Sequence, residues 1–217
     1  MGTSPAHDRV FTGQELAGFL LRASHDLRSQ LRAIRAHSEL LAKQPPTSAD
    51  DPRLGFILQG ATNLEELIEG LNGYALALRT DPAAFAPTPT GVLLRTALAR
   101  LAKQPHKVAE VTYAEMPRVV GDPDRITQLF ESLLRHRGQL ATQLHVSASP
   151  EQGLWLFRFR DNGPALEPRD AERMFEPFIH GLGLAAAREI VERHGGTIRA
   201  ESQDDGGCTV WFELPAG

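Results

Sequence analysis

The chain carries an adjacent histidine and aspartate, His25 and Asp26, which together could support acid–base and nucleophilic chemistry. An exposed imidazole can lose its proton near neutral pH. A neighbouring carboxylate can accept a hydrogen bond from one ring nitrogen, which fixes the tautomer and leaves the other nitrogen as a nucleophile. A simpler interpretation is also open, because His25 is one of eight histidines and charged helix faces carry such residues routinely.

A long amphipathic helix over residues 12–43 is predicted to position this pair. Its apolar or small residues recur at steps of three, four or seven, and they are Leu16, Leu20, Ala23, Leu27, Ile34 and Leu41. His25 lies between two of these positions and is expected to point outward. Pro45 and Pro46 then break the pattern, and a second apolar seam follows over residues 54–78.

Two such helices form an antiparallel hairpin, whose own core is too small for stability. The two seams are best buried against a second copy of the hairpin, as a four-helix bundle. The pattern therefore predicts a homodimer.

Composition limits the classes of protein to which the chain can belong. Its 217 residues, 41% of them hydrophobic, are sufficient for two domains. A net charge of −4 and a pI near 6.1 argue against a nucleic-acid partner. The single cysteine, Cys208, excludes an internal disulfide and fits a reducing compartment. No apolar run approaches the roughly 20 residues of a membrane span, and no signal peptide is evident, so we expect a cytoplasmic location.

The pattern changes at about residue 88, after a proline-marked linker. Helices are predicted at residues 91–103, 122–137 and 184–194, and strands at 107–113, 118–120, 143–149, 154–160, 197–202 and 208–214. This mixture indicates an α/β sandwich, with helices on one face of a mixed sheet. The expected fold class is α+β, with a helical hairpin in residues 1–80 and an α/β domain in residues 88–217.

The segment SHDLRSQL at residues 24–31 resembles the phosphoacceptor box of sensor histidine kinases, especially their phytochrome-like branch. The resemblance implies that His25 is phosphorylated and that Asp26 is its acid/base partner. It also implies that Ser29 helps to remove the phosphate from the partner protein. The family usually has proline at the position of Gln30, so the helix bend that proline causes is not expected here.

Residues 88–217 resemble the ATP-binding domain of histidine kinases and of the wider gyrase, Hsp90, kinase and MutL group. The segments RDNGPALEP (160–168), MFEPF (174–178) and GLGL (181–184) match its first glycine box, phenylalanine box and second glycine box. The resemblance implies that Asp161 binds the adenine amino group and that Gly163 lets the backbone approach the base. In the second glycine box, backbone N–H groups at a helix start suit the phosphates of ATP. The residues of that box are Gly181, Leu182, Gly183 and Leu184.

The helix over residues 122–137 departs from the family pattern of two asparagines followed by a lysine. Ser132 and His136 occupy the asparagine positions, and Gln139 occupies that of the lysine. A neutral imidazole is a poor substitute for an amide oxygen on Mg²⁺, so magnesium binding is in doubt.

Two further departures affect the loops around the nucleotide. Ala165 replaces a glycine of the first glycine box. Only Ile179 and His180 separate Phe178 from Gly181, whereas the family has a mobile lid of about a dozen residues there. Weak binding of ATP, or none, is therefore expected.

Two functions remain compatible with these motifs. One is autophosphorylation of His25 by ATP, followed by transfer to an aspartate on a response-regulator receiver domain. In that case Arg135, Arg137 or His180 would have to take over contacts with the phosphates. The other is a degenerate kinase that accepts phosphate on His25 from a partner, or docks a partner, without using ATP.

Overall fold

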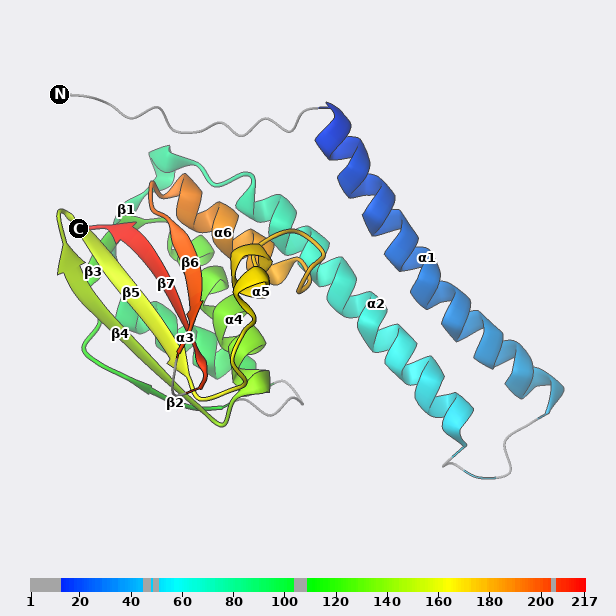
Figure 1. Ribbon diagram of the computed structural model, residues 1–217. Coiled ribbons are helices and arrows are strands. Elements are labelled where there is room, and N and C mark those ends of the chain that lie inside the picture. The colour runs from blue at the N-terminus through cyan, green and yellow to red at the C-terminus, as the bar shows by residue number, and fades with distance from the viewer. Residues whose placement is uncertain (1–12, 45–47, 49–50, 104–108, 204–205) are drawn as a thin grey trace. The chain divides into compact units, whose positions relative to one another are not determined.

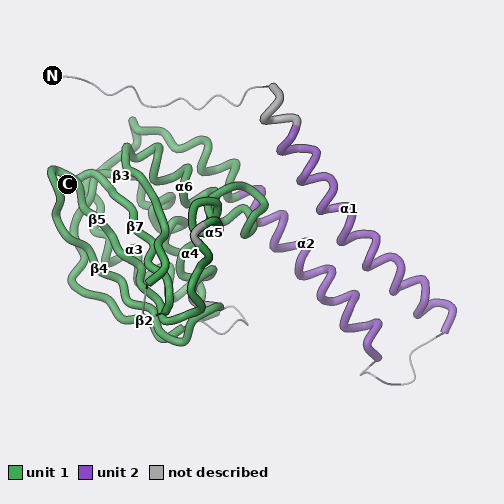
Figure 2. The backbone as a smooth tube through the Cα atoms, viewed as in Figure 1, with its two compact units in different colours: residues 1–7, 73–217 green, residues 8–72 purple. Residues whose placement is uncertain are grey.

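The computed structural model describes residues 13–44, 48, 51–103, 109–203 and 206–217, without the side chains of residues 13–17, 138–139 and 168. The predicted seam residue Leu16 and the side chain of Gln139 therefore lie outside the described part. Packing divides the chain into two units, which meet within helix α2 at residues 72 and 73 (Figures 1 and 2).

The first unit is a helical hairpin made of α1 (Gly13–Lys43) and α2 (Pro52–Ala77). Gly60 of α2 lies so close to α1 that a Cβ atom there would be 2.9 Å from Cγ1 of Ile34. Nearer the loop, the ring of His37 stacks on that of Phe56 with a centroid distance of 4.6 Å. The predicted hairpin is thus present, with both helices as long as the apolar seams indicated.

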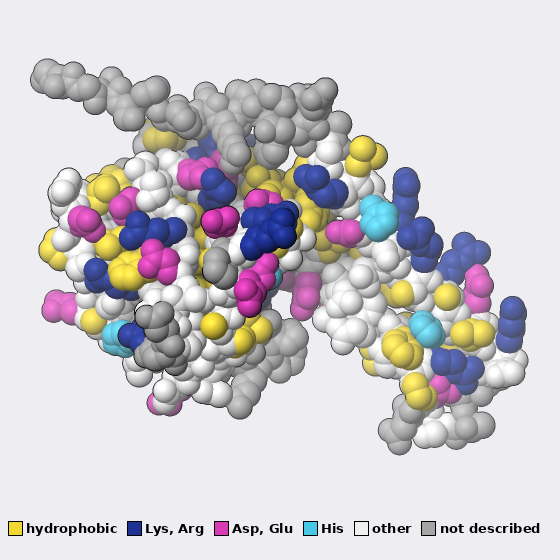
Figure 3. Space-filling view, in the orientation of Figure 1, with side chains coloured by type: hydrophobic (Ala, Val, Ile, Leu, Met, Phe, Trp, Pro, Cys, Tyr) yellow, Lys and Arg dark blue, Asp and Glu magenta, His cyan; other side chains and the backbone are white. Residues whose placement is uncertain are grey.

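The hairpin leaves much apolar surface uncovered within the single chain. Of the predicted seam, Ala23 is buried, whereas Leu20 is 54% exposed. The large apolar side chains that remain exposed on the hairpin include Leu20, Leu21, Leu31, Leu40, Phe56, Leu58 and Ile68. In Figure 3, yellow apolar side chains accordingly lie among charged ones on the surface of the hairpin.

The second unit is a layered α/β domain. Its five-stranded sheet has the order β2-β4-β5-β7-β6, in which only β2 and β4 pair in parallel. The five strands are β2 (Glu110–Tyr113), β4 (Gln143–Glu151), β5 (Leu154–Asp161), β6 (Ile198–Ser202) and β7 (Cys208–Pro215). A separate two-stranded sheet pairs β1 (Ala86–Pro89) with β3 (Arg118–Gly121).

Helices cover one face of the five-stranded sheet (Figure 1). They are α3 (Thr90–Leu101), α4 (Pro123–Leu140) and α6 (Gly183–Arg193), with the short α5 (Pro168–Arg173) beside β6. Phe130 of α4 is fully buried against the aromatic rings of Phe157, Phe159 and Phe212 from the sheet. Burial of such large rings contributes strongly to stability, so this cluster fixes α4 on the sheet.

The α+β fold class predicted from the sequence is confirmed, and the differences are local. Strand β1 and the 3₁₀ turn at Pro82–Ala84 lie in the predicted linker, and α5 was not expected. Strand β4 also extends to Glu151, which leaves Gln152 and Gly153, both with positive φ, as the turn to β5. None of the described helices combines the length and apolar character that a membrane span requires.

Candidate functional site

The residues predicted to handle phosphate lie together on α1. The side chain of His25 is 74% exposed, and its Nδ1 lies 3.1 Å from Oδ1 of Asp26. A carboxylate accepts hydrogen bonds, so this contact fits the tautomer that has its proton on Nδ1 and its lone pair on Nε2. Ser29 follows four residues later and is exposed. Since residues four apart share a helix face, the hydroxyl of Ser29 lies on the side of the imidazole.

Basic side chains share this face of α1. Arg28 and Arg32 lie three and seven residues after His25 and are exposed. Figure 3 shows Lys and Arg side chains along the outer edge of the hairpin. The resulting local positive charge favours the approach of an anionic group to His25.

The start of α4 is held by a side-chain cap. The carboxylate of Asp122 accepts hydrogen bonds from the backbone N–H groups of Asp124 and Arg125, at 2.9 and 3.2 Å, and Pro123 occupies the first helical turn. Phe130 and the buried leucines of α4 then set the rotation of the helix on the sheet. This rotation determines where the later residues of α4, among them Ser132, His136 and Arg137, point.

Arg137 and Asp161 form a buried, two-pronged ion pair. Nε of Arg137 donates to Oδ2 of Asp161 at 2.6 Å, and Nη2 donates to Oδ1 at 2.8 Å. Both side chains are 0% exposed. Burial opposes the charged form of Arg137, but the hydrogen bonds to Asp161 and the charges of Cys208 and Asp161 together outweigh it, so the pKa of Arg137 is raised. The carboxylate predicted to recognise adenine is thus already bound by the chain's own guanidinium.

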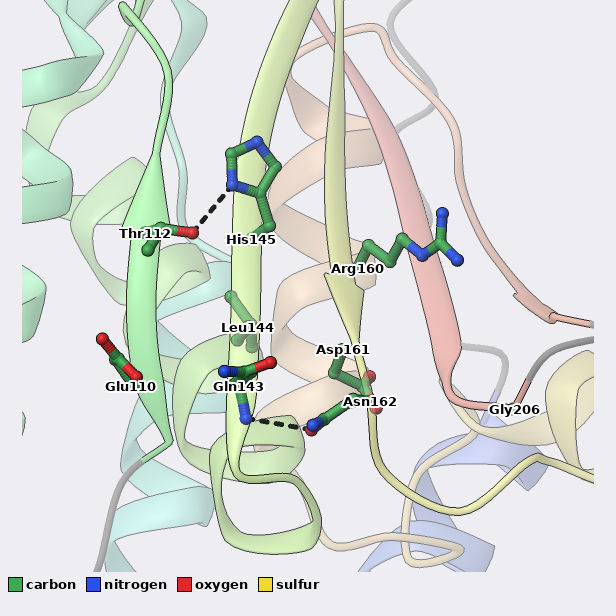
Figure 4. A pocket seen from close by; sticks show the side chains of 9 residues that line it. All are labelled: Glu110, Thr112, Gln143, Leu144, His145, Arg160, Asp161, Asn162 and Gly206. Atoms are coloured by element: carbon green, nitrogen blue, oxygen red, sulfur yellow. Dashed lines mark hydrogen bonds between the residues drawn. The ribbon is translucent and has the colours of Figure 1, made fainter.

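The backbone around Asp161 is fixed on several sides. Oδ1 of Asn162 accepts hydrogen bonds from the backbone N–H groups of Thr142 and Gln143, at 3.0 and 2.9 Å. Figure 4 shows the bond to Gln143 at the edge of a pocket of about 390 Å³, which is lined by Glu110, Thr112, Gln143, Leu144, His145, Arg160, Asp161, Asn162 and Gly206. A Cβ atom on Gly163 would lie 3.0 Å from the carbonyl oxygen of Leu140. The end of α4 therefore occupies the space beside this glycine.

The second glycine box packs against the other predicted residues of α4. A Cβ atom on Gly183 would lie 3.6 Å from Oγ of Ser132, and the rings of His136 and His180 are 5.2 Å apart. Burial, together with the nearby charges of His180 and Arg137, lowers the pKa of His136 to about 4. His136 is therefore neutral at physiological pH.

The remaining residues of this box have mixed environments. Leu182 and Leu184 are buried, whereas Gly181 is exposed with a φ of +83°. Helix α6 begins at Gly183, and no side chain caps its first N–H groups. These uncapped backbone N–H groups lie at the N-terminal end of α6, an arrangement that suits an anion.

The adenine end of this site does not fit a nucleotide in the described arrangement. The predicted roles of Asp161 and Gly163 require a free acceptor for the adenine amino group and room for the base, but Arg137 occupies the acceptor and the backbone of Leu140 lies beside Gly163. At the position predicted to bind Mg²⁺, His136 presents a neutral imidazole nitrogen, whereas the ion prefers hard oxygen ligands. Among the described residues, no group of three or more His, Cys, Asp or Glu side chains is placed to hold a metal ion.

Arg137 is the residue whose position the sequence did not reveal. The sequence suggests it only as a possible phosphate ligand. A signal was present, because Arg137 follows Phe130, Leu133 and Leu134 at helical spacing on an apolar face. A cation on a buried face requires a buried anion, although the sequence alone does not name the partner.

The chain is similar in sequence to several known proteins. Residues 121–217 match the family described as histidine kinase-, DNA gyrase B-, and HSP90-like ATPase. Over 98% of its length the chain is 31% identical to cyanobacterial phytochrome A of Nostoc sp., of which it covers 30%. Over 93% of its length it is 25% identical to the sensor histidine kinase WalK of Bacillus subtilis, of which it covers 37%. The chain thus spans about a third of the length of these curated relatives.

Solved structures show the same fold. The Acinetobacter baumannii histidine kinase AdeS aligns with a TM-score of 0.69 at 20% identity, over 89% of this chain and 98% of that one. The histidine kinase ThkA, solved in complex with the response regulator protein TrrA, aligns with a TM-score of 0.74 at 19% identity, over 93% of this chain and 62% of that one. Residues 121–217 thus match the histidine kinase-, DNA gyrase B-, and HSP90-like ATPase domain, and the chain is related in sequence to a phytochrome and to WalK sensor histidine kinases.

Proposed function

We propose that this chain is a phosphoacceptor core of a two-component system, in which His25 exchanges a phosphoryl group with an aspartate of a response-regulator receiver domain. The observation that carries the proposal is the exposed His25–Asp26 pair, with Nδ1 bonded to the carboxylate at 3.1 Å. A receiver partner is supported by ThkA, which was solved with the response regulator TrrA.

The transfer requires only groups on α1 and the partner's aspartyl phosphate. Nε2 of His25 attacks the phosphorus, an N–P bond forms, and the P–O bond to the receiver aspartate breaks with the carboxylate as leaving group. Asp26 holds the Nδ1 proton and stabilises the positive charge that builds on the ring. Arg28 and Arg32 attract the phosphoryl dianion. We assign Ser29 to a separate role, in the removal of phosphate from the receiver.

ATP is proposed to bind weakly, with little help from Mg²⁺. Asp161 is bound by Arg137, and the neutral imidazole of His136 is a poor magnesium ligand. The family's mobile lid is proposed to be absent, since Phe178 turns directly towards Gly181 and adopts a left-handed φ of +69°, which is uncommon for an aromatic residue.

ATP-dependent autophosphorylation of His25 is the second candidate. The match of residues 121–217 to an ATPase family favours it. It would require Arg137 to release Asp161 before the adenine could bind. In either case we propose a cytoplasmic homodimer with a phosphoacceptor domain in residues 1–80 and an ATPase-type domain in residues 88–217.

Phosphoryl transfer from a ³²P-labelled receiver domain, or from a small phosphodonor such as phosphoramidate, tests the proposal. The label should appear on the chain, be acid-labile, and be lost in His25→Ala, whose exposed side chain contributes little to stability. Label that persists in this variant, or that maps to another histidine, would contradict the assignment.

A parallel incubation with [γ-³²P]ATP and Mg²⁺ separates the two candidates. The relay function predicts label from the receiver and little or none from ATP. Strong labelling of His25 by ATP, lost in His25→Ala, would establish the kinase function instead.

A further inference from the structure

We propose that Arg137 takes the place of the adenine amino group at Asp161 and thereby keeps the ATPase-type domain closed to adenine nucleotides. The inference rests on the proposed role of Asp161 as the adenine-binding carboxylate. It does not depend on whether His25 carries phosphate.

The two donors compete for the same acceptor atoms. Arg137 presents a planar fork of N–H groups, with Nε on Oδ2 at 2.6 Å and Nη2 on Oδ1 at 2.8 Å. The backbone N–H of Gly163 also donates to Oδ1, at 2.8 Å. An adenine amino group would offer a single neutral donor in exchange for two charge-assisted hydrogen bonds, and such bonds are about twice as strong as neutral ones.

Burial makes this exchange still less favourable. Both side chains are 0% exposed, so separating them would leave two charges without compensation in the protein interior. Nη1 of Arg137 has no hydrogen-bond partner among the described residues, and Nη2 contacts the carbonyl oxygen of Pro164 only at 3.5 Å. Asp161 is thus the main acceptor that holds the arginine in place.

The backbone of Asp161 is held in place by its neighbours. A Cβ atom on Gly207 would lie 2.0 Å from the carbonyl oxygen of Asp161, so the start of β7 packs directly on this backbone. Asn162 anchors the next residue through Thr142 and Gln143. Opening of the site therefore depends on the removal of the arginine side chain.

Calorimetric titration of Arg137→Met with ADP and with IDP, both without Mg²⁺, tests the inference. IDP carries a carbonyl oxygen where adenine carries its amino group. The variant should bind ADP at least about tenfold more tightly than the wild type and than it binds IDP, because adenine places a donor at the freed carboxylate where IDP places a carbonyl acceptor. ADP should also raise the melting temperature of the variant but not that of the wild type.

The matched control is Arg100→Ala. It removes another arginine that pairs with a carboxylate of α4, Glu131, at 3.0 Å, but the side chain of Arg100 is 58% exposed. This variant should leave ADP binding unchanged. A gain of affinity equal to that of Arg137→Met would show that the effect is not specific to Asp161.

A second variant keeps the test decisive if Arg137→Met does not fold, as judged by circular dichroism. Arg137→Met/Asp161→Asn removes both charges of the pair, and the amide carbonyl introduced at position 161 still accepts from an amino group. It should also bind ADP more tightly than IDP.

The inference is overturned if the folded variants bind ADP no more tightly than the wild type, or bind ADP and IDP equally. It is also overturned if the wild type itself prefers ADP by tenfold or more. Labelling of His25 by a receiver is measured separately, so failure of either proposal leaves the other standing.

Discussion

The proposed role of Asp26 in phosphoryl transfer can be tested by substitution of this single residue. Its carboxylate is 45% exposed and hydrogen-bonds Nδ1 of His25, so Asp26→Asn should not disturb folding. An amide cannot balance the charge that builds on the ring, and transfer to His25 should slow by roughly 10²–10⁴-fold. Single-turnover transfer from a labelled receiver measures this rate, with Asp26→Glu as the control that keeps the charge. A rate for Asp26→Asn within twofold of the wild type would remove Asp26 from the mechanism.

His136 gives the domain a pH dependence of stability. Burial and neighbouring positive charges lower its pKa from 6.5 to about 4. Between these values the unfolded state binds more protons than the folded state, so stability is full above pH 6.5 and is lost as the pH falls towards about 4. The loss attributable to His136 should be roughly 1–3 kcal/mol.

Urea unfolding at about pH 7.5 and about pH 5 measures this loss. His136→Asn cannot titrate and should show a smaller loss between the two conditions than the wild type. Part of the loss should remain, because burial also lowers the pKa of His194. Equal losses of stability in the two proteins would show that the pKa of His136 is the same in the folded and unfolded states.

At the scale of the element, the β6–β7 connection supports the backbone of Asp161. Gly207 has a φ of +83°, and a Cβ atom there would lie 2.0 Å from the carbonyl oxygen of Asp161, whereas Gly206 has a φ of +90° and open space around it. Gly206→Ala should cost about 1–2 kcal/mol from backbone conformation alone. Gly207→Ala should cost a further 1–3 kcal/mol, roughly, from the clash. The denaturant midpoints of the two variants measure this difference in stability. Equal midpoints would mean that Gly207 does not pack tightly against Asp161.

At the scale of the whole molecule, the exposed apolar side chains of the hairpin predict a homodimer. Leu31 is 52% exposed in the single chain, so Leu31→Asp should cost the isolated chain little. In a dimer interface the same carboxylate would be buried without a partner, and association should weaken by several kcal/mol, roughly 3–5. Light scattering at micromolar concentration should show dimers for the wild type and monomers for the variant.

Ala33→Asp is the matched control for this experiment. Ala33 is also exposed on α1, but it lies two residues away and so faces another side of the helix. This variant should remain dimeric. A wild-type chain that is monomeric would contradict the four-helix bundle, and dissociation of both variants would indicate a general effect of charge on the hairpin.

Features that depend on local sequence pattern could be predicted without a structure. Apolar periodicity predicted both hairpin helices, and Asp122 with Pro123 marked the start of α4, because caps and seams act over a few residues. The ordered glycine and phenylalanine boxes indicated the family. The short α5 and β1 were missed, since elements of six and four residues carry little periodic signal.

The tertiary structure alone decided which cation meets which anion. Arg135, Arg137 and His180 were equivalent candidates in the sequence for contact with phosphates. Arg137 and Asp161 are 24 residues apart and meet only because the aromatic cluster around Phe130 sets the rotation of α4 on the sheet. That rotation results from side-chain packing between distant segments, and it pairs a possible phosphate ligand with the carboxylate that was predicted to bind adenine.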